Sequence, residues 1–443
     1  MAETKIIVLD DDPTGSQTVH GCLLLTRWDV ATLKEALADR SPLFFVLTNT
    51  RGMDAARAAA VTREACRNLK AALAQADVHA VFVSRSDSTL RGHYPVETDV
   101  MAEELGPFDA HFLVPAFFEG GRFTRASVHY LRSDGREIPV HETEFARDSV
   151  FGYHHSFLPD YVEEKTRGRI RSGDVLRLQL DDVRTGVYAR LMQLAGNACV
   201  VVDAEMQGDL DRFAADVLQA AADGKRLLFR SAASLLTSFA RLPAQPVKAE
   251  QMAQYVRAGA AGAVIVGSHV PKTTKQLNEL LKQPGIAPIE IDVNRLPHDR
   301  DQLLREVLEA AEEAHAHGHT LVVYTSRTER QFPTQDARLK FGEQVSAFLM
   351  DVVRRLPVSL GFLISKGGIT SNDVLSTGLQ LRTARLLGQI LPGVSVVRCP
   401  QDHPRYPDMP VVIFPGNVGD EHALAQAFAR LATPAKPPHA ARA

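Results

Sequence analysis

The chain has 443 residues, which predicts two or three domains, and its 45% hydrophobic and 23% charged residues exclude a long disordered chain. Lys and Arg total 50 against 53 Asp and Glu, a net charge of −3, so no basic excess is available to neutralise a nucleic-acid backbone. The apolar runs are far shorter than the ~20 residues that span a bilayer, and a start that leads into Asp10-Asp11-Asp12 is unlike a signal peptide; the sequence therefore predicts a cytoplasmic protein with no nucleic-acid or membrane partner.

Short apolar runs alternate with helical stretches along the first half of the chain. A helix is predicted where Val61, Ala65, Leu69, Ala72 and Ala76 recur at intervals of three or four residues. Continuous apolar runs are expected of strands buried on both faces of a parallel sheet, and they occur at Lys5–Asp10, Leu43–Leu47, Ala80–Val83, His111–Val114 and Cys199–Val202. A hairpin near residues 128–140 and a loop-rich stretch predict an insert over about 123–190.

The same alternation returns in the second half. Strands are predicted at Ala263–Val266, Ile289–Val293, Leu321–Tyr324, Gly361–Ile364, Val394–Val397 and Val411–Phe414, with helical periodicity over 304–311 and 341–352. Two prolines in residues 241–250 indicate a linker. We therefore expect two α/β domains, residues 1–245 and 246–432, each with a mainly parallel sheet flanked by helices, and a flexible tail over 433–443.

Polar side chains follow four predicted strands of the first domain, where ligands bind in open α/β sheets. The first strand leads into three aspartates and Thr14, the second into Thr48-Asn49-Thr50-Arg51, and the third into residues 84–93 with Arg85, Asp87 and Arg91. Arginine binds carboxylates bidentately, and hydroxyls with carboxylates suit a polyol. A helix cap or a structural ion pair explains any one of these groups, but four polar strand ends together predict a site for a small, oxygen-rich anion such as a sugar acid.

Glycine turns follow three predicted strands of the second domain. They are Gly267-Ser268, Gly367-Gly368-Ile369-Thr370 and Gly416-Asn417. Glycines let the backbone approach phosphate oxygens closely, although the first turn lacks the second glycine of a Walker A motif. Each turn alone could be only a tight turn, whereas three together suggest a nucleotide. An acid site and a phosphate site on separate domains predict phosphoryl transfer across a cleft, with a divalent ion and a base beside the attacking hydroxyl.

At these residues the sequence resembles the four-carbon acid sugar kinase family. The resemblance is carried by Asp11-Asp12-Pro13-Thr14-Gly15, by the glycine turns and, most specifically, by Asp87-Ser88-Thr89-Leu90-Arg91-Gly92. It extends over nearly the whole chain in the same order. It implies an acid-sugar-binding domain and an ATP-binding domain with both ligands in the cleft between them. The implied reaction transfers the γ-phosphoryl group to the terminal hydroxyl of a tetronate such as D-threonate, D-erythronate or a 3-oxo-tetronate.

The resemblance also implies roles for individual residues. Asp12 or Asp11 would be the base that accepts the hydroxyl proton, with Asp87 as the alternative. The expected substrate-binding residues are Thr14, Arg51, Asp87, Ser88, Thr89 and Arg91. The expected ATP-binding residues are Gly267, Ser268, Gly367, Gly368, Ile369, Thr370, Gly416 and Asn417. Mg²⁺ is expected with ATP, its protein ligands are not identified, and a homodimer is compatible with the sequence.

The chain departs from the family pattern in three places, which leaves the substrate open. His269-Val270 stands where Cys-Ser is usual, Ser84-Arg85-Ser86 precedes Asp87 in place of a lysine-containing run, and Pro415 replaces a serine. The alternatives are a kinase of another small hydroxy acid or polyol, and a non-catalytic sensor of sugar acid and nucleotide. The carboxylates beside the expected ligand favour catalysis over the sensor. A dehydrogenase is disfavoured because no Gly-x-Gly-x-x-Gly follows a strand.

Overall fold

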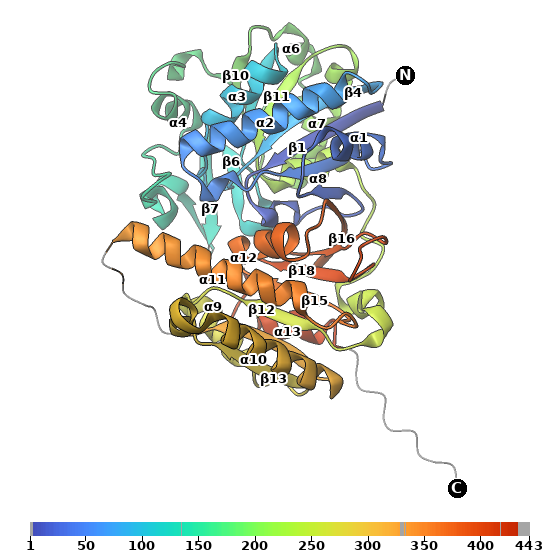
Figure 1. Ribbon diagram of the computed structural model, residues 1–443. Coiled ribbons are helices and arrows are strands. Elements are labelled where there is room, and N and C mark those ends of the chain that lie inside the picture. Colours follow the sequence, from blue (N-terminus) through green and yellow to red (C-terminus); the bar gives the residue numbers. More distant parts are fainter. Residues whose placement is uncertain (1–2, 134, 328–331, 333, 417, 433–443) are drawn as a thin grey trace. The chain divides into compact units, whose positions relative to one another are not determined.

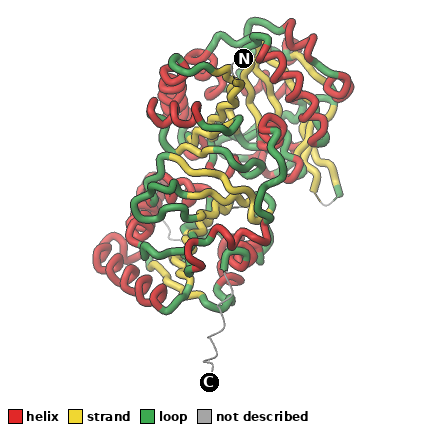
Figure 2. The backbone as a smooth tube through the Cα atoms, turned by 90° about the vertical axis from the view of Figure 1, so that its right-hand side faces the viewer, coloured by secondary structure: helices red, strands yellow, loops and turns green. Residues whose placement is uncertain are grey.

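A computed structural model describes residues 3–133, 135–327, 332, 334–416 and 418–432 of the chain (Figure 1). The chain divides into two compact units, Met1–Ala244 and Gln245–Ala443. Each unit is an α/β structure in which helices flank a sheet (Figure 2). The tail expected to be flexible lies outside the described residues. In the described part, no helix combines the length and the apolarity that crossing a membrane requires.

The first unit is built on an all-parallel sheet with the strand order β2-β3-β1-β4-β11-β5-β10-β9. Its strands are β1 (Glu3–Asp10), β2 (Leu23–Leu25), β3 (Leu43–Leu47), β4 (Val78–Arg85), β5 (Ala110–Val114), β9 (Leu176–Leu178), β10 (Ala198–Val202) and β11 (Leu227–Ser231). A separate antiparallel sheet holds β6 (Arg122–Arg125), β7 (Val128–Ser133) and β8 (Arg136–Pro139), in the region where a hairpin was predicted.

The helices of the first unit cover the sheet with their apolar faces. They are α1 (Val30–Ala38), α2 (Ala55–Leu73), α3 (Val96–Leu105), α4 (Leu158–Lys165), α5 (Leu180–Thr185), α6 (Tyr188–Gln193), α7 (Gln207–Ala222) and α8 (Ala233–Ala240). In α2, Val61, Ala65 and Leu69 of the predicted periodic set are buried, and Ala65 and Leu69 share a core with Phe44 of β3. Ala76 lies beyond the end of this helix.

The second unit has a mixed sheet with the strand order β13-β14-β12-β15-β18-β17-β16. Its strands are β12 (Ala263–Val266), β13 (Ile286–Ile291), β14 (Thr320–Thr325), β15 (Leu363–Lys366), β16 (Thr383–Leu391), β17 (Val394–Arg398) and β18 (Pro410–Phe414). Its helices are α9 (Pro271–Leu280), α10 (Leu296–Ala316), α11 (Gln335–Arg355), α12 (Gly368–Asp373) and α13 (Ala423–Ala429). The neighbours β13, β14, β12, β15 and β18 run parallel to one another, so the mainly parallel arrangement is confirmed.

The prediction that Val394–Val397 belongs to a parallel sheet was wrong. The strand exists as β17, but it pairs antiparallel with both β16 and β18. The reason is the two-residue connection Pro392-Gly393 between β16 and β17, with φ of 74° at Gly393. Such a short turn joins only antiparallel neighbours, since a parallel crossover needs a dozen residues or more.

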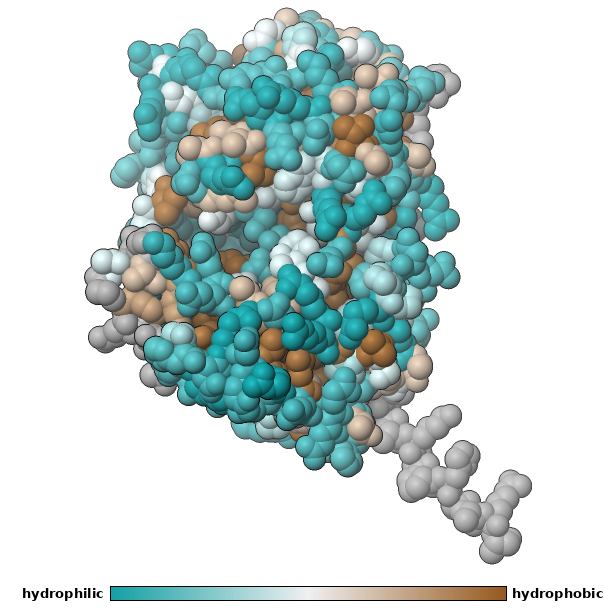
Figure 3. Space-filling model, viewed as in Figure 1, coloured by the Kyte–Doolittle hydropathy of each residue, from teal (hydrophilic) through white to brown (hydrophobic). Residues whose placement is uncertain are grey.

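Several strands were not predicted. β2 and β9 have three residues each, too few to show a pattern, and β16 carries Arg385, Gly388 and Gln389. β11 ends in Phe229-Arg230-Ser231, whose polar residues concealed a strand that is fully buried between β4 and β5. Hydrophilic side chains dominate the molecular face in Figure 3, where apolar groups are small and scattered.

Candidate active site

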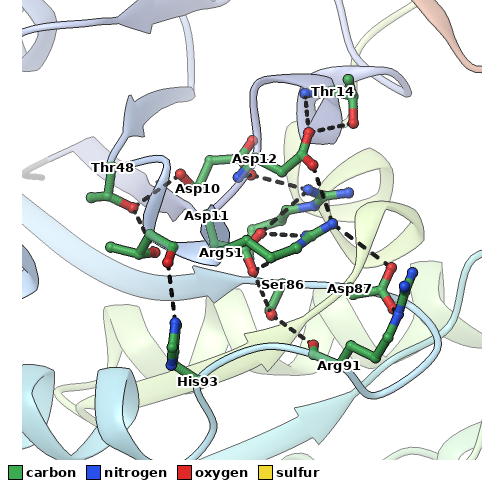
Figure 4. A network of polar contacts seen from close by, with 12 residues as sticks. Asp10, Asp11, Asp12, Thr14, Thr48, Arg51, Ser86, Asp87, Arg91 and His93 are labelled. Atoms are coloured by element: carbon green, nitrogen blue, oxygen red, sulfur yellow. Dashed lines mark hydrogen bonds and ion pairs between the residues drawn. The ribbon is translucent and has the colours of Figure 1, made fainter. Parts of the chain in front are cut away.

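The carboxyl ends of β1, β3 and β4 bring three polar segments together (Figure 4). These strands are neighbours in the parallel sheet, so the residues that follow them emerge at the same edge. Asp11 and Asp12 follow β1, Arg51 follows β3 within a short 3₁₀ turn, and the segment from Ser86 to Arg91 follows β4. The structure thus gathers the predicted catalytic aspartates and the predicted substrate-binding residues of this unit into one network.

Arg51 lies at the centre of this network, between three carboxylates. Its Nη2 is 2.5 Å from Asp11 Oδ1, and its Nη1 is 3.2 Å from Asp12 Oδ2 and 3.9 Å from Asp87 Oδ1. Burial alone would lower the pKa of Arg51, but the three carboxylates outweigh it and raise the pKa well above its ordinary value. The permanent charge of Arg51 therefore allows three acids to remain close together.

Asp11 lies behind the network, and both of its oxygens are occupied. Arg51 donates to both oxygens, Ser86 Oγ donates to Oδ2 at 2.8 Å, and Arg85 Nη1 lies 3.7 Å from Oδ1. The Asp11 side chain is 1% exposed. These contacts give Asp11 the role of holding Arg51 and leave it no oxygen for a substrate.

Asp12 presents one carboxylate oxygen toward the network and uses the other locally. Its Oδ1 accepts hydrogen bonds from the Thr14 amide at 2.8 Å and the Thr14 hydroxyl at 2.5 Å, which caps the 3₁₀ turn Pro13–Ser16. Its Oδ2 faces Arg51, and 21% of the side chain is exposed. Burial opposes ionisation, but Arg51 and Arg85 outweigh it, so the pKa of Asp12 lies below its ordinary value.

Asp87 is the second partly exposed carboxylate. Its Oδ2 accepts from the Thr89 amide, the Thr89 hydroxyl and Arg91 Nε, the last at 3.0 Å. Burial is outweighed by Arg51 and Arg91, so the pKa of Asp87 is well below its ordinary value. The Thr14 and Thr89 hydroxyls thus donate to protein carboxylates. In the described part of the chain, the Ser88 hydroxyl has no hydrogen-bond partner.

Two buried acids beneath the network have raised pKa values, in contrast to Asp12 and Asp87. Glu97 of α3 accepts from the Thr50 hydroxyl at 2.5 Å, and burial followed by repulsion from Asp11 raises its pKa to about 7. Asp10 lies 3.1 Å from Arg85, yet burial raises its pKa to about 7 as well. Gly15 packs closely against Asp10 and Arg85, since a Cβ at this position would lie 2.3 Å from Asp10 Oδ2.

The expected set missed three residues around Arg91. The guanidinium carbon of Arg91 lies 5.0 Å from the centre of the Phe145 ring, and that of Arg122 lies 5.9 Å from it. Asp148 Oδ2 is 3.7 Å from Arg91 Nη1. Gly121-Arg122, Phe145 and Asp148 also lie in segments that resemble the four-carbon acid sugar kinase family, and this resemblance is the signal that could have found them. The guanidinium groups of Arg91 and Arg122, both beside the Phe145 ring, form a positively charged surface that suits a carboxylate.

In the second unit, the glycine turns follow three neighbouring strands, β12, β15 and β18. Gly267 admits no side chain, because a Cβ would lie 2.8 Å from Thr370 Oγ1, and Gly367 has φ of 111°. Gly368, Ile369 and Thr370 begin α12, and the Ile369 side chain is 71% exposed. Ser268 precedes α9 and Gly416 follows β18. Asn417 lies outside the described residues.

Two cations at these turns were not among the predicted site residues. Lys366, the last residue of β15, donates from its buried Nζ to Pro415 O at 2.5 Å and Gly416 O at 3.2 Å, and it lies 4.4 Å from the centre of the Phe414 ring. Burial, followed by repulsion from Lys272, lowers its pKa to about 7. Arg327 Nη2 donates to Ser268 O at 2.6 Å, which ties the first glycine turn to the segment after β14.

No cluster of three or more His, Cys, Asp or Glu side chains suited to a metal occurs among the described residues. The tract His315-Ala316-His317 lies at the C-terminal end of α10, where His315 Nε2 contacts Ser359 Oγ at 2.8 Å and His317 Nδ1 contacts Glu313 O at 2.8 Å. The site of the first unit therefore offers arginines and carboxylates, and the turns of the second unit offer backbone groups and the cations Lys366 and Arg327.

Comparison with known proteins agrees with this division of chemistry. A family model described as a sugar-binding N-terminal domain matches residues 6–239, and one described as a nucleotide-binding C-terminal domain matches residues 263–424. The chain belongs to the four-carbon acid sugar kinase family.

Similarity to two curated relatives of this kinase family extends over part of the chain. A D-erythronate kinase of Heliobacterium modesticaldum is 27% identical over 48% of this chain and 47% of the relative. A D-threonate kinase of Bordetella bronchiseptica is 32% identical over 36% of this chain and 39% of the relative. The match spans less than half the length of each.

Solved structures share the fold of this four-carbon acid sugar kinase family member over most of the chain. A Haemophilus influenzae protein, assigned to a family of unknown function, has 18% identity and a TM-score of 0.66, covering 96% of this chain and 100% of that chain. A Salmonella typhimurium LT2 protein has 18% identity and a TM-score of 0.69, covering 96% and 98%. At this identity the likeness establishes the α/β fold alone.

Proposed function

We propose that the protein is an ATP-dependent kinase that phosphorylates the terminal hydroxyl of a four-carbon sugar acid of the threonate, erythronate or 3-oxo-tetronate type. The observation that carries the proposal is the pair of partly exposed carboxylates, Asp12 and Asp87, held together by Arg51. The family membership and the names of the curated relatives support a kinase of this class. The cytoplasmic location and a homodimer stay predictions.

In this proposal, residues 1–245 form the acid-sugar-binding domain. Arg91 binds the substrate carboxylate, because part of its guanidinium is exposed beside Asp87 and the Phe145 ring. Arg51 and the Ser88 hydroxyl contribute donors near the same edge of the sheet. Thr14 and Thr89 act through the carboxylates to which they donate. The substrate is thereby held by its acid end, which leaves the far hydroxyl free to react.

Asp12 is the proposed base, with Asp87 as the alternative. Its lowered pKa keeps the carboxylate ionised at neutral pH, so Oδ2 can accept a hydrogen bond from the attacking hydroxyl. A weak base is sufficient, since little proton transfer is needed early in a loose phosphoryl-transfer transition state. Asp11 holds Arg51 in place and takes no proton from the substrate.

Residues 246–432 form the proposed nucleotide-binding domain. The fit to phosphates rests on the three glycine turns and on Lys366, which holds the turn at Pro415-Gly416 against the end of β15. Mg²⁺ neutralises phosphate charge when the nucleotide is bound. It commonly keeps several waters and takes one or two protein carboxylates.

The decisive experiment is a coupled ADP-release assay with Mg-ATP and a panel of acids: D- and L-threonate, D- and L-erythronate, 3-oxo-tetronates and longer aldonates. Turnover with one tetronate well above the others supports the proposal and names the substrate. Turnover with a longer aldonate alone supports a kinase of another hydroxy acid. No turnover by folded protein that binds both ATP and a tetronate in calorimetry supports the sensor and overturns the proposal.

A further inference from the structure

The loop Asp87–Gly92 is held by its backbone carbonyls, and this arrangement has a consequence for the site. Each carbonyl from Asp87 to Arg91 accepts a hydrogen bond from a side chain. Arg230 Nη2 donates to Asp87 O at 2.8 Å and to Arg91 O at 3.1 Å, and Ser86 Oγ also donates to Arg91 O at 3.2 Å. The remaining three carbonyls accept from His129 at Ser88 (2.8 Å), Tyr153 at Thr89 (2.7 Å) and Tyr161 at Leu90 (2.8 Å).

The donors come from four different places in the fold. Arg230 is in β11, His129 in β7, Tyr161 in α4, and Tyr153 in the loop that precedes α4. All four side chains are at most 3% exposed. We call Arg230, His129, Tyr153 and Tyr161 the carbonyl clamp. None of them belongs to the set that the sequence suggested for the site.

The chemistry of the clamp keeps its donors unchanged over the working pH range. Burial raises the pKa of Tyr161 to about 12 and also raises that of Tyr153, so both hydroxyls keep their protons. Burial lowers the pKa of His129 to about 4, so its ring is neutral. Nε2 then carries the proton that goes to Ser88 O, and Nδ1 accepts from the Thr124 hydroxyl at 2.9 Å.

The clamp also holds a backbone conformation that costs energy. Leu90 has φ of 67° and Gly92 has φ of 118°, both in the left-handed region. For a leucine this conformation persists only where the surroundings over-determine it. The Leu90 carbonyl bound by Tyr161 and the packed Leu90 side chain, 1% exposed, supply that support.

Arg230 adds a charge as well as hydrogen bonds. Its side chain is 1% exposed, and within the described residues no carboxylate lies within ion-pairing distance of it. Nε and Nη1 are buried there without a hydrogen-bond partner. An arginine in this position places a positive charge behind the loop, which favours an anion in front of it.

We propose that Arg230, His129, Tyr153 and Tyr161 are positioning residues that fix the Asp87–Gly92 loop in the geometry that binds and orients the acid substrate. Because the clamp holds the carbonyls, it also fixes where the loop presents the partly exposed side chains of Asp87 and Arg91 to the substrate. The inference rests on the proposed function only for the identity of that substrate.

The test compares Tyr153→Phe, Tyr161→Phe and their double variant with Tyr406→Phe. The control removes an equally buried hydroxyl that donates to a carbonyl, Leu356 O at 2.8 Å, in the second unit. We expect backbone amides of residues 87–92 to exchange hydrogen at least tenfold faster in the double variant than in the control. We also expect kcat/KM for the acid to fall at least tenfold, with KM for ATP changing less than twofold.

A folding check and a pair of Arg230 variants separate an effect on loop position from an effect on protein stability. Assays are run where circular dichroism shows each variant folded, and Arg230→Lys is compared with Arg230→Met, with partial rescue of acid binding expected from the lysine. Loop exchange and kcat/KM equal to those of Tyr406→Phe overturn the inference. An inactive wild-type enzyme would overturn the proposed function instead, and loop exchange would still decide whether the clamp acts.

Discussion

Arg51 binds Asp11 bidentately, with Nη2 2.5 Å from Oδ1 and Nε 3.1 Å from Oδ2. The two residues follow different strands, and their contact fixes the distance between the ends of β1 and β3. The same guanidinium then reaches Asp12 and Asp87 through Nη1. A lysine has one nitrogen and cannot reproduce this planar fork, so the geometry of the acid site depends on arginine at this position.

Replacing Arg51 with Met should be among the most destabilising changes in the first unit. It leaves Asp11 buried without its partner, and breaking a buried ion pair in this way costs about 3–5 kcal/mol. Urea unfolding followed by circular dichroism measures the free energy of unfolding. Arg63→Met is the matched control, since Arg63 pairs with Glu103 on the surface; an equal loss in both variants would show that Arg51 has no special role.

Asp12→Asn and Asp87→Asn should separate the base from a binding residue. Asparagine at 12 can still accept from Thr14 but no longer offers a carboxylate to the hydroxyl, so we expect kcat to fall by roughly 10²–10⁴ with little change in KM. Asparagine at 87 weakens its contact with Arg91, so KM for the acid should rise. Asp99→Asn, which disturbs a surface pair with Arg169, is the control. The reverse pattern would make Asp87 the base.

Glu97→Gln should change how stability depends on pH. The folded pKa of about 7 lies above the ordinary 4.5, so the folded protein binds more protons between these values and its stability falls as pH rises from 4.5 to 7. Glutamine removes this loss. We therefore expect the variant to gain about 1–3 kcal/mol relative to wild type between pH 5 and pH 8. Urea unfolding at four pH values tests this, with exposed Glu64→Gln as control; a constant difference would contradict it.

Lys366→Met should weaken nucleotide binding and leave acid binding intact. Methionine keeps an apolar contact with Phe414 but loses the bonds to the Pro415 and Gly416 carbonyls, so the third glycine turn is released. We expect Kd for ATP to rise about tenfold, equivalent to about 1.4 kcal/mol. Titration calorimetry with ATP and with the acid measures both constants. Lys282→Met, from a surface pair with Glu279, serves as control, and unchanged ATP binding by Lys366→Met would exclude this role.

Much of the fold could be predicted because the buried parallel strands are apolar along their whole length. Leu43–Leu47 and Ala263–Val266 have the predicted bounds, and the other predicted strands differ by a few residues. Strands that contain polar residues were not predicted, because those residues are buried only where they find hydrogen-bond partners. β11 is the main example. Its Arg230 is hidden because it donates to carbonyls about 140 residues earlier in the chain, a contact that local sequence cannot reveal.

The polar strand ends could likewise be predicted, but the different contacts that each aspartate makes could not. Among the three consecutive aspartates, Asp11 and Asp12 were equal candidates for the base, with Asp87 as the alternative. The structure distinguishes them by orientation: Asp10 is directed to Arg85, Asp11 to Arg51 and Ser86, and Asp12 partly to solvent. These directions depend on partners in other segments, since Asp11 and Asp12 lie beyond the end of β1. Lys366 was missed because its two carbonyl partners lie about 50 residues away.

The position of β11 has a consequence for how the first unit is assembled. The strands β2, β3, β1 and β4 form one run of neighbours and β5, β10 and β9 form another, and β11 is the strand that joins them. It is also the last strand of the unit to leave the ribosome. Without residues 227–231, β4 and β5 would each present an unpaired edge, and pairing between segments this far apart in the chain is slow. The strand that closes the sheet also carries Arg230, so it supplies the donor to the carbonyls of Asp87 and Arg91.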